Sequence, residues 1–155
     1  MSISKTLNPL PQAGHVGLNV SDLKRSITFY QEVFGFLLIK ESQEDDRRFA
    51  FLGDGQTTVI TLWEQSEGRF ERGRPGLHHL SFRVGTIDEV REIEQRLKTR
   101  DVHLLYEGIV PHSEGAESGG LFFEDPDGLR LEVFSPTGAN IQAAPVPGAP
   151  SCGFF

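Results

Sequence analysis

The chain has 155 residues, enough for one domain, and 37% of them are hydrophobic, enough for a folded core. Its 15 Lys and Arg against 22 Asp and Glu give a formal charge of −7, which argues against a nucleic-acid surface and against attraction to anionic lipid. No apolar run approaches the roughly 18 residues of a membrane span, the start has no apolar signal-peptide core, and the single Cys152 fits a reducing compartment, so we expect a soluble cytoplasmic protein.

The first half of the body predicts a strand, a helix and three more strands. Residues 15–20 are expected to form the first strand, and Ser21 or Asp22 can cap the helix that follows. The apolar spacing places that helix at 23–34, and Gly35 suits its end. The three strands are expected at 36–41, 47–53 and 57–64, with a Gly-Asp-Gly turn before the last.

The second half repeats this order after a charged, Gly-rich linker over residues 65–76. A strand is expected at 79–84, followed by a helix over 87–99, where Thr86 and Glu89 have capping-box spacing. The remaining strands are expected at 102–110, 118–124 and 129–135, with a Pro- and Gly-containing turn at 125–128.

The body, residues 14–135, is therefore a single domain of two βαβββ modules, 14–64 and 77–135, in the α+β class. Residues 15–20 align with 79–84 at an offset of 64. One four-stranded sheet with one helix leaves strand edges and an apolar face uncovered, and two copies solve that within one chain or across a dimer.

The flanking segments, 1–13 and 136–155, show no strand or helix period. The second of them is rich in Pro, Gly and Ala, which predicts an extended or disordered tail. Its ending, residues 153–155, is apolar enough to dock instead, for example on a neighbouring subunit.

Two histidines and one glutamate stand out as candidate metal ligands. His15 and His79 occupy the same position in the two modules, so pseudo-twofold packing would bring them close together, as half of a metal site. Glu132 lies among apolar residues on a presumed central strand, where a carboxylate is costly unless a cation or hydrogen-bond donors pair with it. A metal ion would meet that need, and so would Arg130, two residues away on the same face, or exposure at a sheet edge.

Three segments together resemble the vicinal oxygen chelate superfamily. These are residues 26–36 (SITFYQEVFGF), 79–84 (HLSFRV) and 123–132 (FEDPDGLRLE). This superfamily includes glyoxalase I, fosfomycin-resistance thiol transferases, methylmalonyl-CoA epimerase, extradiol dioxygenases and the metal-free bleomycin-resistance proteins. The resemblance covers residues 14–135 and implies a curved mixed sheet around a metal-binding cup.

The resemblance also implies a ligand set. Its first-strand, fifth-strand and last-strand ligands fall on His15, His79 and Glu132, a 2-His-1-carboxylate face suited to one divalent ion such as Fe2+, Mn2+, Zn2+ or Ni2+. The fourth ligand of glyoxalase I falls on Thr61, which cannot replace Glu or Gln. Glu64 is three residues further on, so we expect it on the opposite, solvent-facing side of the strand.

Strand parity predicts which residues line the pocket. The expected lining is Asn19, Thr61, Trp63, Phe122 and Arg130. His112 lies in a Gly- and Ser-rich loop over 111–120; it is either a solvated side chain or a general base on a closing lid.

The resemblance implies a metal-dependent enzyme that forms a homodimer, and from the charge and composition we expect it to bind neither nucleic acid nor membrane. A small substrate would chelate the ion through two adjacent oxygens, and Glu132 and the ion would stabilise an enolate, alkoxide or catecholate in lyase, transferase or dioxygenase chemistry. The alternative is a metal-free protein that sequesters a small molecule, as bleomycin-resistance proteins do.

Overall fold

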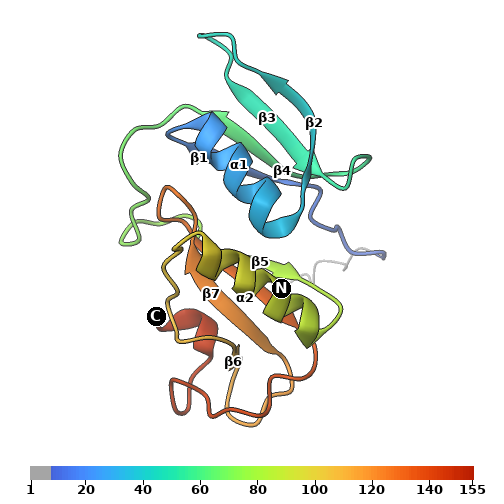
Figure 1. Ribbon diagram of the computed structural model, residues 1–155, viewed down its shortest axis with the longest axis vertical. Helices are drawn as coiled ribbons and strands as arrows, with labels where there is room; N and C mark the ends of the chain where they lie inside the picture. The colour runs from blue at the N-terminus through green and yellow to red at the C-terminus, as the bar shows by residue number, and fades with distance from the viewer. Residues whose placement is uncertain (1–7) are drawn as a thin grey trace, which may run out of the picture.

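The computed structural model describes residues 8–155, so residues 1–7 of the expected N-terminal tail lie outside the described residues. Module 1 contains β1 (Val16–Val20), α1 (Leu23–Phe34), β2 (Leu37–Ser42), β3 (Phe49–Gly53) and β4 (Thr58–Glu64). Module 2 contains β5 (Leu80–Arg83), α2 (Ile87–Thr99), β6 (Val110–Pro111), β7 (Gly119–Glu124) and β8 (Arg130–Ser135), and a short 3-10 turn, η1 (Ser151–Gly153), follows. Module 1 lies above module 2 in Figure 1.

Each module forms its own four-stranded mixed sheet. Sheet A has the strand order β1-β4-β3-β2, and sheet B has the order β5-β8-β7-β6. The first and last strands of each module pair in parallel, and Gly17 opposite Thr61 in sheet A corresponds to Ser81 opposite Glu132 in sheet B. This confirms the α+β fold of two βαβββ modules, and the two sheets do not close into a barrel.

Local signals define both helices. Asp22 caps α1 by accepting a hydrogen bond from the Arg25 amide, and Gly35 ends the helix at φ 74°, a left-handed conformation that glycine adopts without steric cost. In α2, Thr86 and Glu89 form the reciprocal capping box. Both helices span the residues that the sequence predicts.

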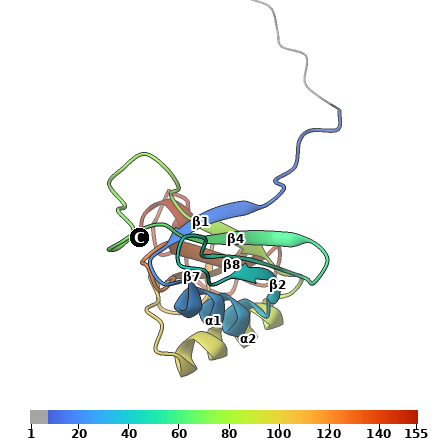
Figure 2. The same cartoon turned by 90° about the horizontal axis from the view of Figure 1, so that it is seen from above.

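Both helices lie on one side of the sheets and leave the other side open (Figure 2). On the helix side, one hydrophobic core runs through both modules. Phe34 of α1 joins the two halves, since its ring centroid lies 4.7 Å from that of Phe82 and 6.0 Å from that of Phe123. The alternate residues of each strand face away from the helices, and we call that side the open face of the sheet.

A polar contact also joins the modules. The Tyr30 hydroxyl of α1 donates a 3.0 Å hydrogen bond to the Asp125 carboxylate in the β7–β8 turn, and both side chains are buried. Burial raises the pKa of both groups, because the charged form of each is poorly solvated. Arg25 pairs with Asp127 of the same turn at 2.9 Å, so this turn holds the N-terminal half of α1.

The strand predicted at 102–110 is wrong for most of its length. Only Val110 and Pro111 pair as β6, and Leu104 makes an isolated bridge to Phe123. Gly108 has φ 71°, which breaks an extended strand, and Asp101 before it has φ 53°. The Val- and Leu-rich composition of this stretch serves packing against sheet B rather than strand pairing.

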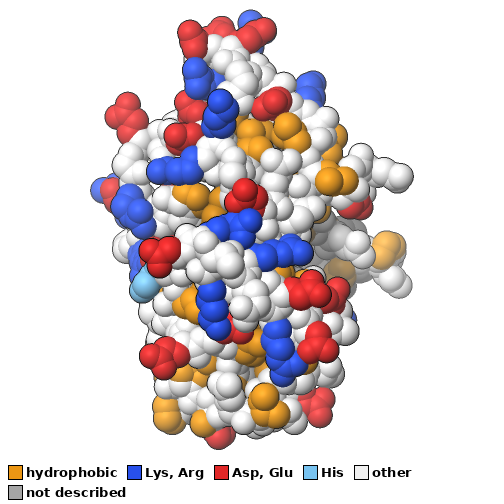
Figure 3. Space-filling view, in the orientation of Figure 1, with side chains coloured by type: hydrophobic (Ala, Val, Ile, Leu, Met, Phe, Trp, Pro, Cys, Tyr) orange, Lys and Arg blue, Asp and Glu red, His pale blue; other side chains and the backbone are white. Residues whose placement is uncertain are grey.

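The tail, residues 136–155, packs against its own module 2. Ala139, Ala144 and Ser151 are buried, and η1 lies beside β7 (Figure 1). The space-filling view of the helix side shows acidic and basic side chains interleaved (Figure 3). Within residues 8–155, no helix has the length and apolar character of a membrane span.

Candidate functional site

Glu132 is the buried centre of the candidate site. It stands in the middle of β8 on the open face of sheet B, with only 3% of its surface exposed. Its Oε1 lies 2.5 Å from Nε2 of His112, and its Oε2 lies 3.5 Å from Nε2 of His79. Among the described residues no Lys or Arg pairs with this carboxylate, so imidazoles fill the role that the sequence left open between Arg130 and a metal.

His79 lies one residue before β5, beside Glu132. Its other ring nitrogen, Nδ1, lies 2.8 Å from Nδ1 of His78, so one of the two imidazoles donates to the other. This contact fixes the ring and directs Nε2 toward the carboxylate. Burial, the charge of Arg130 and the neighbouring His79 lower the pKa of His78.

His112 reaches the same carboxylate from the loop after β6. Its Nδ1 lies 2.9 Å from the Ser118 hydroxyl, and its backbone amide donates to the Ser118 carbonyl oxygen. Two contacts across a short loop therefore orient the ring toward Glu132. Sequence reasoning offered only a solvated side chain or a general base on a closing lid, because nothing local connects residue 112 with residue 132.

His15 lies apart from this group. It is exposed at the start of β1, and the position in sheet A that corresponds to Glu132 is Thr61. Within the described part of one chain, no three His, Cys, Asp or Glu side chains group closely enough to hold a metal ion. The structure thus brings together two of the three predicted ligands, His79 and Glu132, and the complete set stays a prediction.

The predicted pocket residues fall on two separate open faces. On sheet A, the Trp63 ring donates to the Thr61 hydroxyl at 2.9 Å, and the Asn19 side chain pairs with the backbone of Gln65. Phe122 and Arg130 lie on sheet B beside Glu132. A single pocket lined by all five predicted residues therefore requires the open face of a sheet A to lie against the open face of a sheet B.

Glu64 is committed to the helix side of sheet A. Its Oε2 accepts a 2.7 Å hydrogen bond from the Leu23 amide at the start of α1, and its Oε1 lies 3.5 Å from Arg48. The side chain is 24% exposed, so it is less solvent-facing than expected. A carboxylate held at a helix N-terminus in this way stabilises the fold.

Several neighbours of the site were missed by sequence reasoning. The ring of Phe155 in the tail packs against Phe122 and Tyr106, and the Arg130 guanidinium lies over it at 5.1 Å. The only sequence signal was the apolar ending of the tail. Burial and the charge of Glu132 raise the pKa of the Cys152 thiol, which lies in the same segment.

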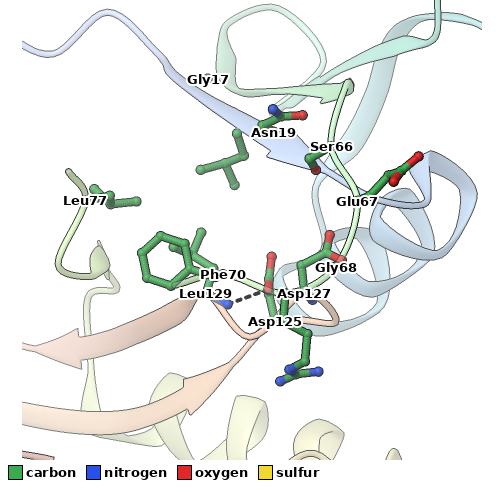
Figure 4. Close-up of a pocket in the computed structure, with 12 residues that line it drawn as sticks. Gly17, Asn19, Ser66, Glu67, Gly68, Phe70, Leu77, Asp125, Asp127 and Leu129 are labelled. Carbon is green, nitrogen blue, oxygen red and sulfur yellow. Dashed lines mark hydrogen bonds between the residues drawn. The ribbon is translucent and has the colours of Figure 1, made fainter. Parts of the chain in front are cut away.

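A cavity of about 280 Å3 lies elsewhere, at the junction of the modules (Figure 4). Gly17 and Asn19 of β1 line one side of it, and Leu77 and Leu129 of module 2 line the other. Asp125, which lines it, already accepts from the amides of Asp127 and Leu129 and from the Tyr30 hydroxyl, and Asp127 pairs with Arg25. We therefore take the buried Glu132 with its imidazole partners, and not this cavity, as the candidate site.

Comparison with known proteins finds sequences and structures similar to this chain. A family model described as the Glyoxalase/Bleomycin resistance protein/Dioxygenase superfamily matches residues 12–133. The chain is 30% identical to the lactoylglutathione lyase of Neisseria meningitidis serogroup A, over 76% of this chain and 86% of that protein. It is 29% identical to the catechol-2,3-dioxygenase of Bacillus subtilis over 79% of this chain, which spans only 40% of that protein.

Solved structures show the same architecture. A glyoxylase/bleomycin resistance protein/dioxygenase domain from Frankia sp. EAN1pec superposes with a TM-score of 0.65 at 29% identity, covering 81% of this chain and 92% of that one. The fosfomycin resistance protein FosX of Listeria monocytogenes, in a mutant form complexed with Mn(II), gives a TM-score of 0.63 at 21% identity, covering 83% and 94%. At that identity the second similarity speaks for the fold.

Proposed function

Since the chain belongs to the glyoxalase/bleomycin resistance protein/dioxygenase superfamily, we propose that it is a divalent-metal-dependent enzyme acting on a small oxygenated substrate. The observation that supports this most is the buried Glu132 carboxylate, whose side-chain partners are the imidazoles of His79 and His112. A carboxylate buried without a Lys or Arg partner favours a metal ion as its counter-charge.

The residues present fit such an ion. His79 uses Nδ1 toward His78 and keeps Nε2 for an ion, an arrangement typical of ligating histidines. Oε2 of Glu132 lies beside that nitrogen, while Oε1 is held by His112. His112 then orients the ligating carboxylate through the hydrogen bond, and Ser118 fixes the His112 ring in turn.

We propose that His15 is the third ligand and that it comes from a second copy of the chain. His15 is exposed and, in one chain, forms no group with His79 and Glu132, whereas its position in module 1 matches that of His79 in module 2. A homodimer that sets module 1 of one copy against module 2 of the other would unite the open faces of sheets A and B. Asn19, Thr61 and Trp63 would then line one pocket with Phe122 and Arg130.

When bound, the ion would supply Lewis acidity toward two adjacent substrate oxygens. The protein's own part is to keep two or three coordination positions free of side chains and to exclude water with aromatic walls. His112 is within hydrogen-bond distance of Glu132 and can carry a proton at Nε2 without leaving its contact with Ser118. Lyase, transferase and dioxygenase chemistry all remain compatible with these roles.

A second function is a metal-free small-molecule binding protein. It is favoured because, within the described residues of one chain, no three His, Cys, Asp or Glu side chains group closely enough to hold a metal ion, while the Phe155 ring packs beside His79. The two functions differ in metal content. Protein purified without chelator is expected to contain about one divalent ion per subunit by plasma mass spectrometry. Absence of metal together with tight ligand binding would support the binding protein.

Histidine variants test the ligand set. His15→Ala, His79→Ala and Glu132→Ala are each expected to lose the ion. His112→Ala should lower metal affinity roughly 10–100-fold, because His112 acts on the ion only through Glu132. The site of this variant should still fill at saturating metal. His103→Ala is the matched control, since His103 is exposed and far from these contacts in the chain. Metal retained in His15→Ala and lost in His112→Ala would contradict the proposed set.

Mixed dimers test the origin of His15. Neither the His15→Ala nor the Glu132→Ala homodimer should hold metal. When the two variants are co-expressed with different tags, the mixed dimer should regain one of its two metal sites. In that site the Glu132→Ala chain supplies an intact His15, and the His15→Ala chain supplies intact His79 and Glu132. A mixed dimer that stays empty would show that each chain supplies its own ligands.

A further inference from the structure

The tail ends in an aromatic cradle on the open face of sheet B. The Phe155 ring centroid lies 5.3 Å from that of Phe122, 5.8 Å from that of Tyr106, 6.0 Å from that of His78 and 6.3 Å from that of His79, with the Arg130 guanidinium carbon 5.1 Å away. We call these five neighbours the aromatic cradle. They come from distant parts of the chain, and the Phe155 ring packs among them as the ring of a bound aromatic ligand would.

Ser151 anchors the segment that carries Phe155. It is fully buried, its amide donates to the His112 carbonyl at 2.8 Å, and its hydroxyl donates to the Pro111 carbonyl at 2.6 Å. The Tyr106 hydroxyl donates to the Ser151 carbonyl at 2.8 Å. Gly153 follows with open space around it, and Phe154 is 63% exposed. The anchor is therefore firm, whereas the last residues can swing about Gly153.

Arg130 gives the cradle a charge preference. Its residue is only 7% exposed, and its Nε donates to the His78 carbonyl at 3.0 Å. No carboxylate pairs with it within residues 8–155, and the face of the Phe155 ring is its nearest aromatic contact. A buried guanidinium with donors left over favours an anion, and a cation over a ring favours aromatic character.

The cradle adjoins the candidate site. Phe122 is the register partner of Glu132, Arg130 lies two residues before it on the same face, and His79 contacts its carboxylate. A ring bound in the cradle therefore lies beside the proposed ligands. Phe155 covers the same surface that a substrate would need to reach.

We propose that the cradle is a binding site for an aromatic anion and that Phe155 is its built-in occupant, which an incoming ligand must displace. The ligand ring takes the place of Phe155 against Phe122 and Tyr106, and its anionic group pairs with Arg130. The tail thus acts as a gate that turns about Gly153 while Ser151 stays fixed. Its role in gating catalysis rests on the proposed function, whereas the exchange between tail and ligand does not need a metal.

Probe binding to chelator-treated protein tests the exchange. The probe is 8-anilinonaphthalene-1-sulfonate, an aromatic anion that fluoresces when bound. Phe155→Ala and a chain ending at Cys152 are expected to bind it about tenfold more tightly than the wild type, because the occupant no longer competes. Phe154→Ala is the matched control, since its ring is exposed, and should leave the affinity unchanged.

Two further measurements separate the proposal from general loosening. Arg130→Gln should remove the preference for this probe over N-phenyl-1-naphthylamine, its uncharged relative, whereas Arg130→Lys should retain part of it. Cys152 is the single cysteine and lies next to the anchor. Its alkylation by iodoacetamide should become several-fold faster at saturating probe in the wild type and should respond little in Phe155→Ala.

Equal probe affinity in the wild type and Phe155→Ala would overturn the proposal, and so would an equal gain in Phe154→Ala. Probe binding that Trp63→Ala abolishes and Arg130→Gln leaves unchanged would place the probe on sheet A and would also contradict the proposal. Because metal is absent from these experiments, they can fail while the metal analysis succeeds, and the reverse. The two proposals are thereby tested independently.

Discussion

The open faces of sheets A and B have the same frame and different contents. Glu132 on sheet B corresponds to Thr61 on sheet A, and His79 corresponds to His15. The tail lies over Glu132 and His79 with Phe155 and η1, while sheet A carries a half-buried aromatic cluster of Phe49, Phe51 and Trp63. A repeated backbone therefore carries a buried carboxylate beneath the tail in module 2, and an aromatic cluster with Lys40 over one of its rings in module 1.

This difference separates the residues on the helix side, which stabilise the fold, from the residues on the open face, which carry the candidate site. The helix side of both sheets is apolar and continuous through the core, so it tolerates little change. The open face is free to vary because no helix packs on it. Features that serve function should therefore be sought where the two modules differ.

The largest expected loss of stability comes from removing an aromatic ring on the open face of sheet B, which the tail covers. Phe122→Ala should reduce the free energy of unfolding by about 3–5 kcal/mol, because its ring is 1% exposed and its loss leaves a cavity. Trp63→Ala should cost only about 1 kcal/mol in the monomer, since that ring is half-buried on the uncovered face. Urea denaturation measures both changes.

Dependence on protein concentration sharpens this comparison. If a second copy covers sheet A in solution, the Trp63→Ala cost should grow with concentration, while the Phe122→Ala cost should not. Equal costs for the two variants at low concentration would mean that the two faces do not differ as described.

The sequence predicted the parts of the fold that local chemistry sets. Both helices begin and end where their capping residues indicate, and His79, Arg130 and Glu132 share a face as strand parity requires. The strand expected at 102–110 failed because an apolar composition does not show whether a partner strand is within reach.

The rest of the site depends on contacts between distant residues. His112 meets Glu132 only because β6 places a loop beside β8, and β6 is two residues long. The docking of Phe155 requires neighbours from β7, from β8, from the residues just before β5 and from the loop that holds Tyr106, so no pattern within the tail could reveal it. The expectation of a disordered tail followed from its composition, whereas its binding site lies elsewhere in the chain.

A smaller effect is expected where the modules meet. The hydrogen bond from Tyr30 to Asp125 joins the two modules and so helps to hold the two open faces in a fixed relation. Tyr30→Phe should cost about 1–3 kcal/mol, because it leaves a buried carboxylate oxygen without its donor. A cost below about 0.5 kcal/mol by urea denaturation would show that the core alone fixes the modules.

The smallest expected effect is a difference in how the aspartates of the two hairpin turns make stability depend on pH. Burial raises the pKa of Asp125 in the β7–β8 turn, with Asp127 adding to the shift, whereas amides of Thr57 and Gln56 lower the pKa of Asp54 in the β3–β4 turn. A raised pKa means that the folded chain binds the proton more tightly, so this contribution is present at acidic pH and lost as the pH rises through the folded value. Because the pKa of Asp54 is lowered, its contribution to stability is present at neutral pH and is lost as the pH falls through the folded value.

Asn variants expose the two signs. As the pH falls from 7 to 4, the unfolding free energy of the wild type relative to Asp125→Asn should rise, because only the wild type gains from protonating this buried group. Relative to Asp54→Asn it should fall, because protonation removes the negative charge that strengthens the hydrogen bonds from the Thr57 and Gln56 amides. Urea titrations at several pH values measure both differences. Trends of the same sign would mean that the Asp125 carboxylate is better solvated than its burial indicates, and the turn of module 2 would then behave like that of module 1.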